Sequence, residues 1–351
     1  MGVPALLIAA VSLAPAPANG QAGTAIAKPK TTSSAKPGST KPGSTKPGAT
    51  KTWTPPRTPD GQPDLQGIWS NATITPLERP DDLAGKPVLT EKEEAAYEKD
   101  VLRRTNVDRR EGILGTEADV ARAYNQFWYD RGTKTVGTRR TSLIVDPPDG
   151  KIPPLTPEAQ KRVDDRDMRR ARLAEGPEDR SLSERCILWQ TAGPPMLPSG
   201  YNNNYRIVQS RGYVTIFNEM IHDTRIIPLD GSPHLPQNIR LWMGDSRGHW
   251  EGDTLVIDTT NFTAKTAFRG ASENLHLVER FTRADAETLL YSFTVDDPSS
   301  FARPWTAEIT SVRSQGPIFE YACHEGNYGM TGLLAGARAE EKKAAQGTEK
   351  K

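Results

Sequence analysis

The sequence predicts a mainly β protein with peripheral helices, in which an antiparallel meander closes into a barrel or packs as a sandwich. Nine short runs, apolar throughout or alternating apolar and polar, follow one another from about residue 205. Most of the connections between them are short and rich in turn residues, as in a meander. The two clear helix signals both precede residue 175. The 351-residue chain is 35% hydrophobic, which is typical of a globular protein.

The first 58 residues have the composition of an exported protein's leader and tether. An uncharged apolar run over residues 3–13 is followed by small residues, so we expect a signal peptide over 1–22 and export to the periplasm or beyond. The pentapeptide Lys-Pro-Gly-Ser/Ala-Thr occurs three times, starting at Lys36, Lys41 and Lys46. Proline and glycine disfavour helix and strand, so the range 23–58 is predicted to be a disordered tether.

The remaining chain is predicted to form one domain with a charged tail. Residues 59–185 are expected to form a helical and extended region that wraps around an antiparallel β core over 186–335. Thr90 and Glu93 form a capping box, and Thr156 precedes a proline at a first helical position, so both positions should begin helices. The second helix is so charged that we expect it on the solvated surface. Residues 336–351 are predicted to be a charged, disordered tail.

The predicted strands follow from apolar runs bounded by turn residues, and one motif between them resembles a catalytic turn. The segment Gly244-Asp-Ser-Arg-Gly248 matches the nucleophile-elbow pattern, but no helix signal follows it, so we expect a hairpin loop and no serine nucleophile at Ser246. The strands are expected over 205–210, 213–220, 224–229, 239–243, 254–259, 275–281, 288–295, 305–314 and 318–323.

Charge is distributed unevenly along the chain. The formal net charge is +1, yet residues 1–58 contain seven basic residues and no acidic residue. The other 38 basic and 44 acidic residues leave a net charge of −6 on the rest. A domain of that sign repels polyphosphate, so no nucleic-acid partner is expected. The lysines of the tether favour contact with an anionic cell-envelope surface, and a solvated spacer is the alternative.

The two cysteines are candidates for a disulfide. Cys186 and Cys323 lie 137 residues apart and have no second cysteine or histidine at zinc-like spacing. In an exported protein a disulfide between them is the expectation, and two buried thiols are the alternative.

Histidines and carboxylates are the candidate functional groups. All five histidines lie in the predicted β half, and most have a carboxylate nearby in sequence. An imidazole beside a carboxylate suits acid–base chemistry, and several such groups that converge can hold a divalent metal ion. Structural hydrogen bonding is the alternative role for each histidine. The candidate pocket residues are Glu219, His222, Arg225, Asp245, His276, His324 and Glu325.

Four motifs together resemble a widespread family of exported bacterial proteins that carry no assigned activity. They are 226–230 (IIPLD), 244–256 (GDSRGHWEGDTLV), 274–280 (NLHLVER) and 320–328 (EYACHEGNY). The similarity spans Pro56 to Arg338 and implies export and a single domain, and it transfers no catalytic residue. Lipocalin-like ligand-binding barrels are an analogy of fold alone.

These observations predict an exported soluble protein that binds a small molecule in a polar-lined β pocket. The first alternative is a hydrolytic or isomerising enzyme that uses the same histidines and carboxylates as acid and base, with or without a divalent metal. The second alternative is a non-catalytic envelope component in which the tether is the functional part.

Overall fold

The computed structural model describes residues 53–121, 125–266 and 268–348. The chain divides into two units, 1–51 and 52–351, and the second contains the fold described below. The expected signal peptide and most of the expected tether therefore lie outside the described residues.

The second unit is built from β-strands with helices before, between and after them. Its helices are α1 (Glu91–Thr105), α2 (Glu117–Ala121), α3 (Pro157–Ala171) and α4 (Tyr328–Thr348). Short 3₁₀ helices lie at Asp81–Leu83, Gln126–Trp128, Pro177–Asp179, Met220–His222 and Phe268–Gly270. The strands are β1 (Gly67–Ser70), β2 (Ile144–Asp146), β3 (Asn204–Ser210), β4 (Tyr213–Asn218), β5 (Thr224–Pro228), β6 (Asp245–Glu251), β7 (Thr254–Thr260), β8 (His276–Arg283), β9 (Thr288–Asp296) and β10 (Trp305–Arg313).

Nine of these strands form an antiparallel barrel that is nearly closed. Their order is β5-β4-β3-β1-β10-β9-β8-β7-β6, and β2 pairs with β10 beside this path. The sheet thus combines two meanders, β3 to β5 and β6 to β10, which β1 joins by pairing with both β3 and β10. The prediction of a mainly β fold with peripheral helices is confirmed, and the architecture is a barrel rather than a sandwich.

The barrel has a seam between β5 and β6, which are neighbours without a shared ladder of hydrogen bonds. Gly248 allows this close approach. A Cβ atom there would lie 2.6 Å from Cδ2 of Leu229 and 3.0 Å from Cγ2 of Ile227. Arg225 of β5 also crosses the seam, because its guanidinium donates to the Ser246 hydroxyl of β6 at 3.2 Å.

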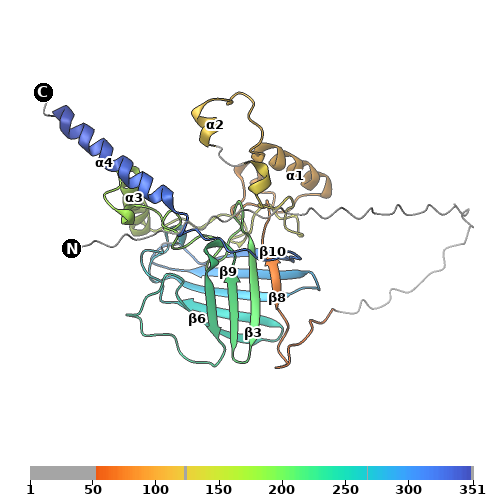
Figure 1. The fold of residues 1–351 in the computed structure, drawn as a ribbon. Helices are drawn as coiled ribbons and strands as arrows, with labels where there is room; N and C mark the ends of the chain where they lie inside the picture. Colours follow the sequence, from red (N-terminus) through yellow and green to blue (C-terminus); the bar gives the residue numbers. More distant parts are fainter. Residues whose placement is uncertain (1–52, 122–124, 267, 349–351) are drawn as a thin grey trace, which may run out of the picture. The chain divides into compact units, whose positions relative to one another are not determined.

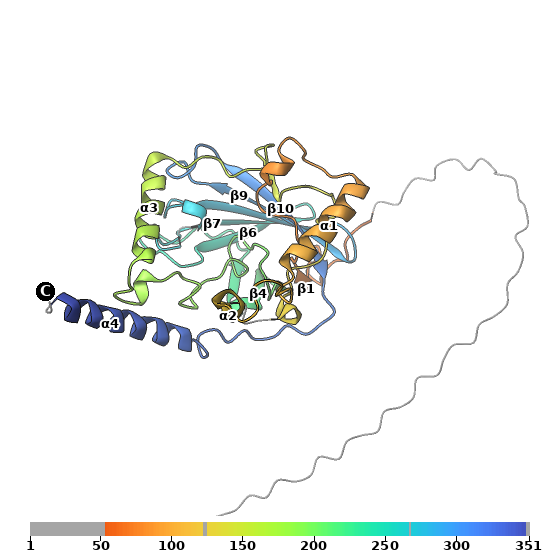
Figure 2. The same ribbon diagram turned by 90° about the horizontal axis from the view of Figure 1, so that it is seen from above.

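The helices gather at one end of the barrel (Figure 1). Both views place α1 and α3 on opposite sides of this end (Figures 1 and 2). Thr90 and Glu93 form the expected capping box at α1, and the Thr156 hydroxyl accepts from the backbone N–H of Ala159 at α3. Ala159 is the only buried residue of α3, so the prediction of a solvated helix is confirmed.

Side chains fill the barrel interior. Inward residues alternate with outward ones along β8, β9 and β10, as the pleat requires. Large buried rings meet inside, with the centroids of Phe281 and Tyr291 4.6 Å apart and those of Phe293 and Trp305 5.8 Å apart. The loop 191–197 is buried throughout, and the backbone N–H of Met196 donates to the Tyr291 hydroxyl. The interior is therefore a packed core.

Strands β1 and β2 lie within 59–185, outside the predicted β core of 186–335, because the barrel needs β1 to join its two meanders. Three segments after residue 200 also differ from the predicted strands. The stretch 244–248, expected as a hairpin loop, instead leads into and begins strand β6. It lacks apolar alternation because its inward positions carry Ser246 and Gly248. The Ser246 hydroxyl hydrogen-bonds with the Thr259 hydroxyl, and Gly248 allows close packing against β5. The ranges 239–243 and 318–323 were predicted as strands but have no ladder; Leu241 makes only an isolated bridge with Phe262.

The two ends of the described unit also differ from expectation. The expected tether reached residue 58, but Pro55 is buried and Arg57 pairs with Asp253 at 2.6 Å. The expected tail contains the last part of α4, which continues to Thr348 because its alanines, glutamates and lysines favour helix. Arg338 ties α4 to the carbonyl oxygen of Ala174 at 2.6 Å. None of the described helices is long and apolar enough to cross a membrane.

The expected cysteine pair comes together. Cys186 and Cys323 are joined with their sulfur atoms 1.95 Å apart and their Cα atoms 5.6 Å apart. The bond connects the chain just before the buried loop 191–197 to the segment that precedes α4.

Candidate functional site

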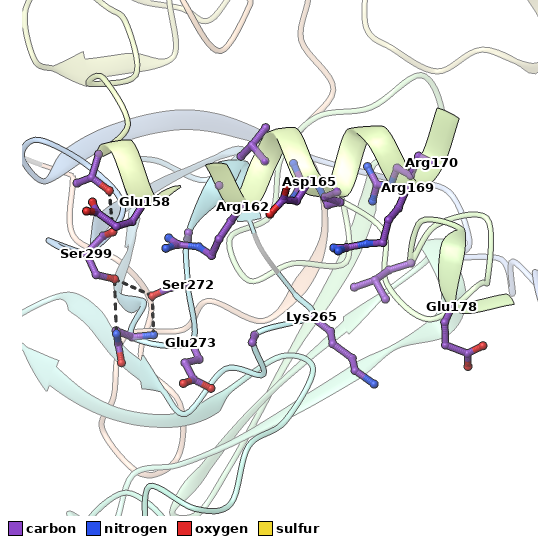
Figure 3. A pocket seen from close by; sticks show the side chains of 18 of the residues that line it. Glu158, Arg162, Asp165, Arg169, Arg170, Glu178, Lys265, Ser272, Glu273 and Ser299 are labelled. Atoms are coloured by element: carbon purple, nitrogen blue, oxygen red, sulfur yellow. Dashed lines mark hydrogen bonds between the residues drawn. The ribbon is translucent and has the colours of Figure 1, made fainter. Parts of the chain in front are cut away.

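A cavity of about 920 Å³ lies beneath α3. Its walls are α3, the segment 178–185, the loop 264–274 and the turn at 298–299 (Figure 3). Cavities of this size hold small molecules in many proteins. None of the seven predicted pocket residues lines it.

The N-terminus of α3 is tied directly to the rim of this cavity. The Thr156 hydroxyl donates to the carbonyl oxygen of Ser299 at 2.9 Å, while the Thr156 backbone N–H donates to the carbonyl oxygen of Ser300 at 2.9 Å. The cap that begins the helix thus also fixes the helix to the β9–β10 connection.

Asp297 joins two loops that line the cavity. Its carboxylate accepts from the Ser272 backbone N–H at 2.6 Å, the Ser299 hydroxyl at 2.6 Å and the Ser300 hydroxyl at 2.7 Å. Burial alone would raise the pKa of Asp297, but hydrogen bonds from Ser299, Ser272 and Ser300 outweigh it and lower the pKa. The charged carboxylate therefore holds two loops in one geometry.

The lining of the cavity is charged and has an excess of positive residues. Figure 3 shows Arg162 and Arg169 projecting from α3 toward the loop that carries Lys265 and Glu273. Arg162 is oriented by the Ser300 hydroxyl at 2.7 Å, and Arg169 and Lys265 make no ion pair with any described residue. The basic lining residues are Arg162, Arg166, Arg169, Arg170, Arg180, Arg185 and Lys265. The acidic ones are Glu158, Asp165, Glu178, Asp179 and Glu273.

A second group of functional side chains lies on the outer face of β6, β7 and β8, where carboxylates and imidazoles alternate. Nδ1 of His234 lies 3.0 Å from Asp245, and its Nε2 lies 2.9 Å from Asp258. The other oxygen of Asp258 lies 2.7 Å from Nε2 of His276. Arg247 donates to Asp245 at 2.7 Å and completes the array.

Hydrogen bonding shifts the pKa values of two groups in this array. The hydrogen bond from His276 lowers the pKa of Asp258, and the hydrogen bond to Asp258 raises the pKa of His276. The His276 side chain is 41% exposed, and its Nδ1 has no partner among the described residues. An imidazole held in this way by a carboxylate can exchange protons with a bound molecule.

The array brings together two predicted residues, Asp245 and His276, through two that were not predicted. His234 comes from the loop between β5 and β6, and Asp258 faces outward on β7. The sequence signal that could have identified Asp258 is its position as a carboxylate in an otherwise apolar strand, where alternation places it on the outward face. Within the described ranges, no three His, Cys, Asp or Glu side chains are placed to hold a metal ion.

Arg225 occupies a third place, inside the barrel. Its guanidinium donates to both oxygens of Glu279, at 3.1 and 2.5 Å, and the Tyr291 hydroxyl donates to the same carboxylate at 2.7 Å. Both charged side chains are almost completely buried. This arrangement neutralises the guanidinium within the core and binds β5 to β8.

The other four predicted residues lie near the disulfide. Glu219 is buried and accepts from Nδ2 of Asn204 at 2.8 Å and from the backbone N–H of Phe319 at 3.0 Å. His222 lies 3.2 Å from the carbonyl oxygen of Tyr321 through its Nδ1. His324 and Glu325 are exposed in the turn after Cys323. Glu219 and His222 thus anchor the segment that carries the disulfide.

The seven predicted residues are consequently distributed over three places and form no single pocket. No protein-family model, curated protein or solved structure matches the chain.

Proposed function

We propose that this is an exported protein that binds a small molecule with an acidic group in the cavity beneath α3. The observation that carries the proposal is the projection of Arg162 and Arg169 into a cavity of about 920 Å³ whose lining has seven basic and five acidic residues. Guanidinium groups bind carboxylates, phosphates and sulfates through paired, charge-assisted hydrogen bonds.

The proposal keeps the ligand-binding function that the sequence predicts and moves the site. The barrel interior is occupied by aromatic rings and by the Arg225–Glu279 pair, so the space for a ligand lies outside it. The loops 264–274 and 297–300 supply hydroxyl and amide groups around the basic side chains.

Two observations support export. The apolar run and small residues of 1–22 have signal-peptide character, and the Cys186–Cys323 pair is typical of an oxidising compartment.

The test is titration calorimetry of the purified protein with inorganic phosphate, sulfate and succinate at low ionic strength. We expect Arg169→Ala to weaken binding by about tenfold or more, because a charge-assisted contact is removed. Arg172→Ala is the matched control, since Arg172 is an exposed arginine of the same helix end that does not line the cavity. Equal effects of both substitutions, or no binding of any of the three anions, would refute the proposal.

The array on β6 to β8 favours a second candidate function, an enzyme that uses His276 as acid or base. The supporting observation is the partly exposed imidazole of His276, whose Nε2 lies 2.7 Å from Asp258 and whose Nδ1 has no described partner. Chromogenic esters and phosphodiesters would be assayed with the wild type and with His276→Asn. A turnover that survives His276→Asn unchanged would remove this candidate.

A further inference from the structure

A second cavity lies at the end of the barrel away from α3. It measures about 730 Å³ and is formed by residues 58–66, by the β3–β4 hairpin at 209–214, and by Leu229, His249 and Trp250. These segments meet where β3, β5 and β6 end and β4 begins. The cavity therefore shares no residue with the one beneath α3.

The lining of this second cavity is polar but almost uncharged. Asp60 and Arg211 contribute one charge of each sign, and His249 is paired with Glu251 at 3.2 Å. The remaining polar groups are mainly the amides of Gln62, Gln66 and Gln209, with the Tyr213 hydroxyl and the Trp250 indole. Such a surface offers both hydrogen-bond donors and acceptors, and it carries no net charge that would attract an ion.

The wall of the cavity is held in place by hydrogen bonds that do not involve a ligand. Gln209 accepts from the backbone N–H of Leu65 at 2.7 Å and donates to the carbonyl oxygen of Pro63 at 3.0 Å. Gln66 accepts from the Gln209 backbone N–H through its oxygen, so its amide NH₂ stays available. Gln62 and Tyr213 make no side-chain hydrogen bond with another described residue.

Trp250 supplies an unsatisfied donor at this wall. Its indole N–H is buried and has no hydrogen-bond partner among the described residues. A buried donor without an acceptor destabilises a protein and calls for an explanation. A hydroxyl oxygen of a ligand bound against Trp250 would provide that acceptor.

We propose that this cavity binds a neutral carbohydrate. Planar amides and one carboxylate suit the vicinal hydroxyls of a sugar, and the rings of Tyr213 and Trp250 offer apolar surface for its C–H faces. The volume is within the range of small-molecule sites. This inference is independent of the anion site, because it uses the opposite end of the barrel.

The experiment is titration calorimetry of the full chain with glucose, galactose, N-acetylglucosamine and maltose, with tryptophan fluorescence as a second readout. At least one sugar should bind saturably, and Trp250→Phe, which keeps an aromatic ring but removes the indole N–H, should weaken that binding roughly fivefold. Trp189→Phe is the matched control, because Trp189 donates to Ser199 and does not line this cavity.

Gln62→Ala and Tyr213→Ala provide a second test, since both side chains are at least partly exposed and make no hydrogen bond that the fold needs. Both should weaken sugar binding even if Trp250→Phe fails to fold. Added phosphate should not compete with the sugar, and Arg169→Ala should leave sugar affinity unchanged. Absence of saturable binding for all four sugars would overturn the proposal. So would a sugar affinity that does not change in Trp250→Phe, Gln62→Ala or Tyr213→Ala.

Discussion

The two ends of the barrel are built on the same strands and differ in how their cavities are made. At the α3 end, a buried carboxylate, Asp297, orders two loops beneath a helix whose arginines face the cavity. At the other end, an uncharged amide, Gln209, holds the lead-in to β1 against a hairpin. At each end, the residue that holds the segments together matches the charge of the cavity lining. Both are charged at the α3 end, and both are mainly neutral at the other.

The largest expected effect concerns the scaffold that both ends share. Glu279→Ala leaves the guanidinium of Arg225 buried without its partner and should lower the free energy of unfolding by about 3–5 kcal/mol. Urea unfolding would measure the loss. The double substitution Arg225→Met/Glu279→Leu should recover much of it, and a failure to recover would show that packing, not charge, is responsible.

The disulfide should affect stability mainly through the α3 end. Cys186→Ser removes the cross-link between the loop entering the barrel and the segment before α4, with an expected loss of about 2–4 kcal/mol in oxidising buffer. Thermal unfolding with and without reductant checks this. The substitution should have little effect under reductant, and equal losses in both buffers would contradict a disulfide.

Asp297→Ala tests whether the two ends of the barrel bind their ligands independently. It removes the acceptor of several hydrogen bonds beneath α3 and should cost about 2 kcal/mol, and it should weaken anion binding while sparing sugar binding. Gln209→Leu is the mirror control, because it should affect only the sugar cavity. Loss of both ligands in either variant would mean that the ends are coupled.

The smallest expected effect is the pH dependence of the Asp258–His276 pair. Because the pKa of His276 is raised, its protonated imidazole stabilises the folded state. This stabilisation is fully present below the ordinary pKa of 6.5 and is lost as the pH rises through the raised pKa. The lowered pKa of Asp258 contributes above its ordinary value of 3.8 and is lost as pH falls through the lowered pKa. The contribution is therefore largest from about pH 4 to 6.5.

His276→Gln provides the measurement of this pH dependence. The stability difference between the wild type and the variant should reach at most about 1 kcal/mol near pH 5, because the pair is partly exposed, and should shrink toward pH 9. Urea unfolding at both pH values checks the sign. A difference that grows with pH would contradict the pairing.

Several elements could be predicted from local sequence because their signals act over short distances. The alternation in β8 and β9 and the caps at Thr90 and Thr156 all correspond to observed elements. Strand β6 was missed because Ser246 and Gly248 face inward for reasons that lie on other strands. The apolar run 239–243 was misassigned because it packs as a loop beside Asn261.

The candidate sites depended much more on tertiary structure. Asp245 and His276 are 31 positions apart, and they are linked only because His234 and Asp258 lie between them on the barrel surface. The charged helix α3 was predicted to be solvated, but its sequence contains no information on which loops it faces.

Sequence alone thus determined that the second half is rich in strands and where two helices begin, and it favoured the pairing of Cys186 with Cys323, because periodicity, caps and cysteine counts can be read locally. Only the tertiary structure decided that the barrel is filled, that the predicted polar residues are distributed over separate places, and that the cavities lie at the two ends. The physical reason is that a cavity is the space left between segments far apart in the chain, and barrel closure and core packing determine that space.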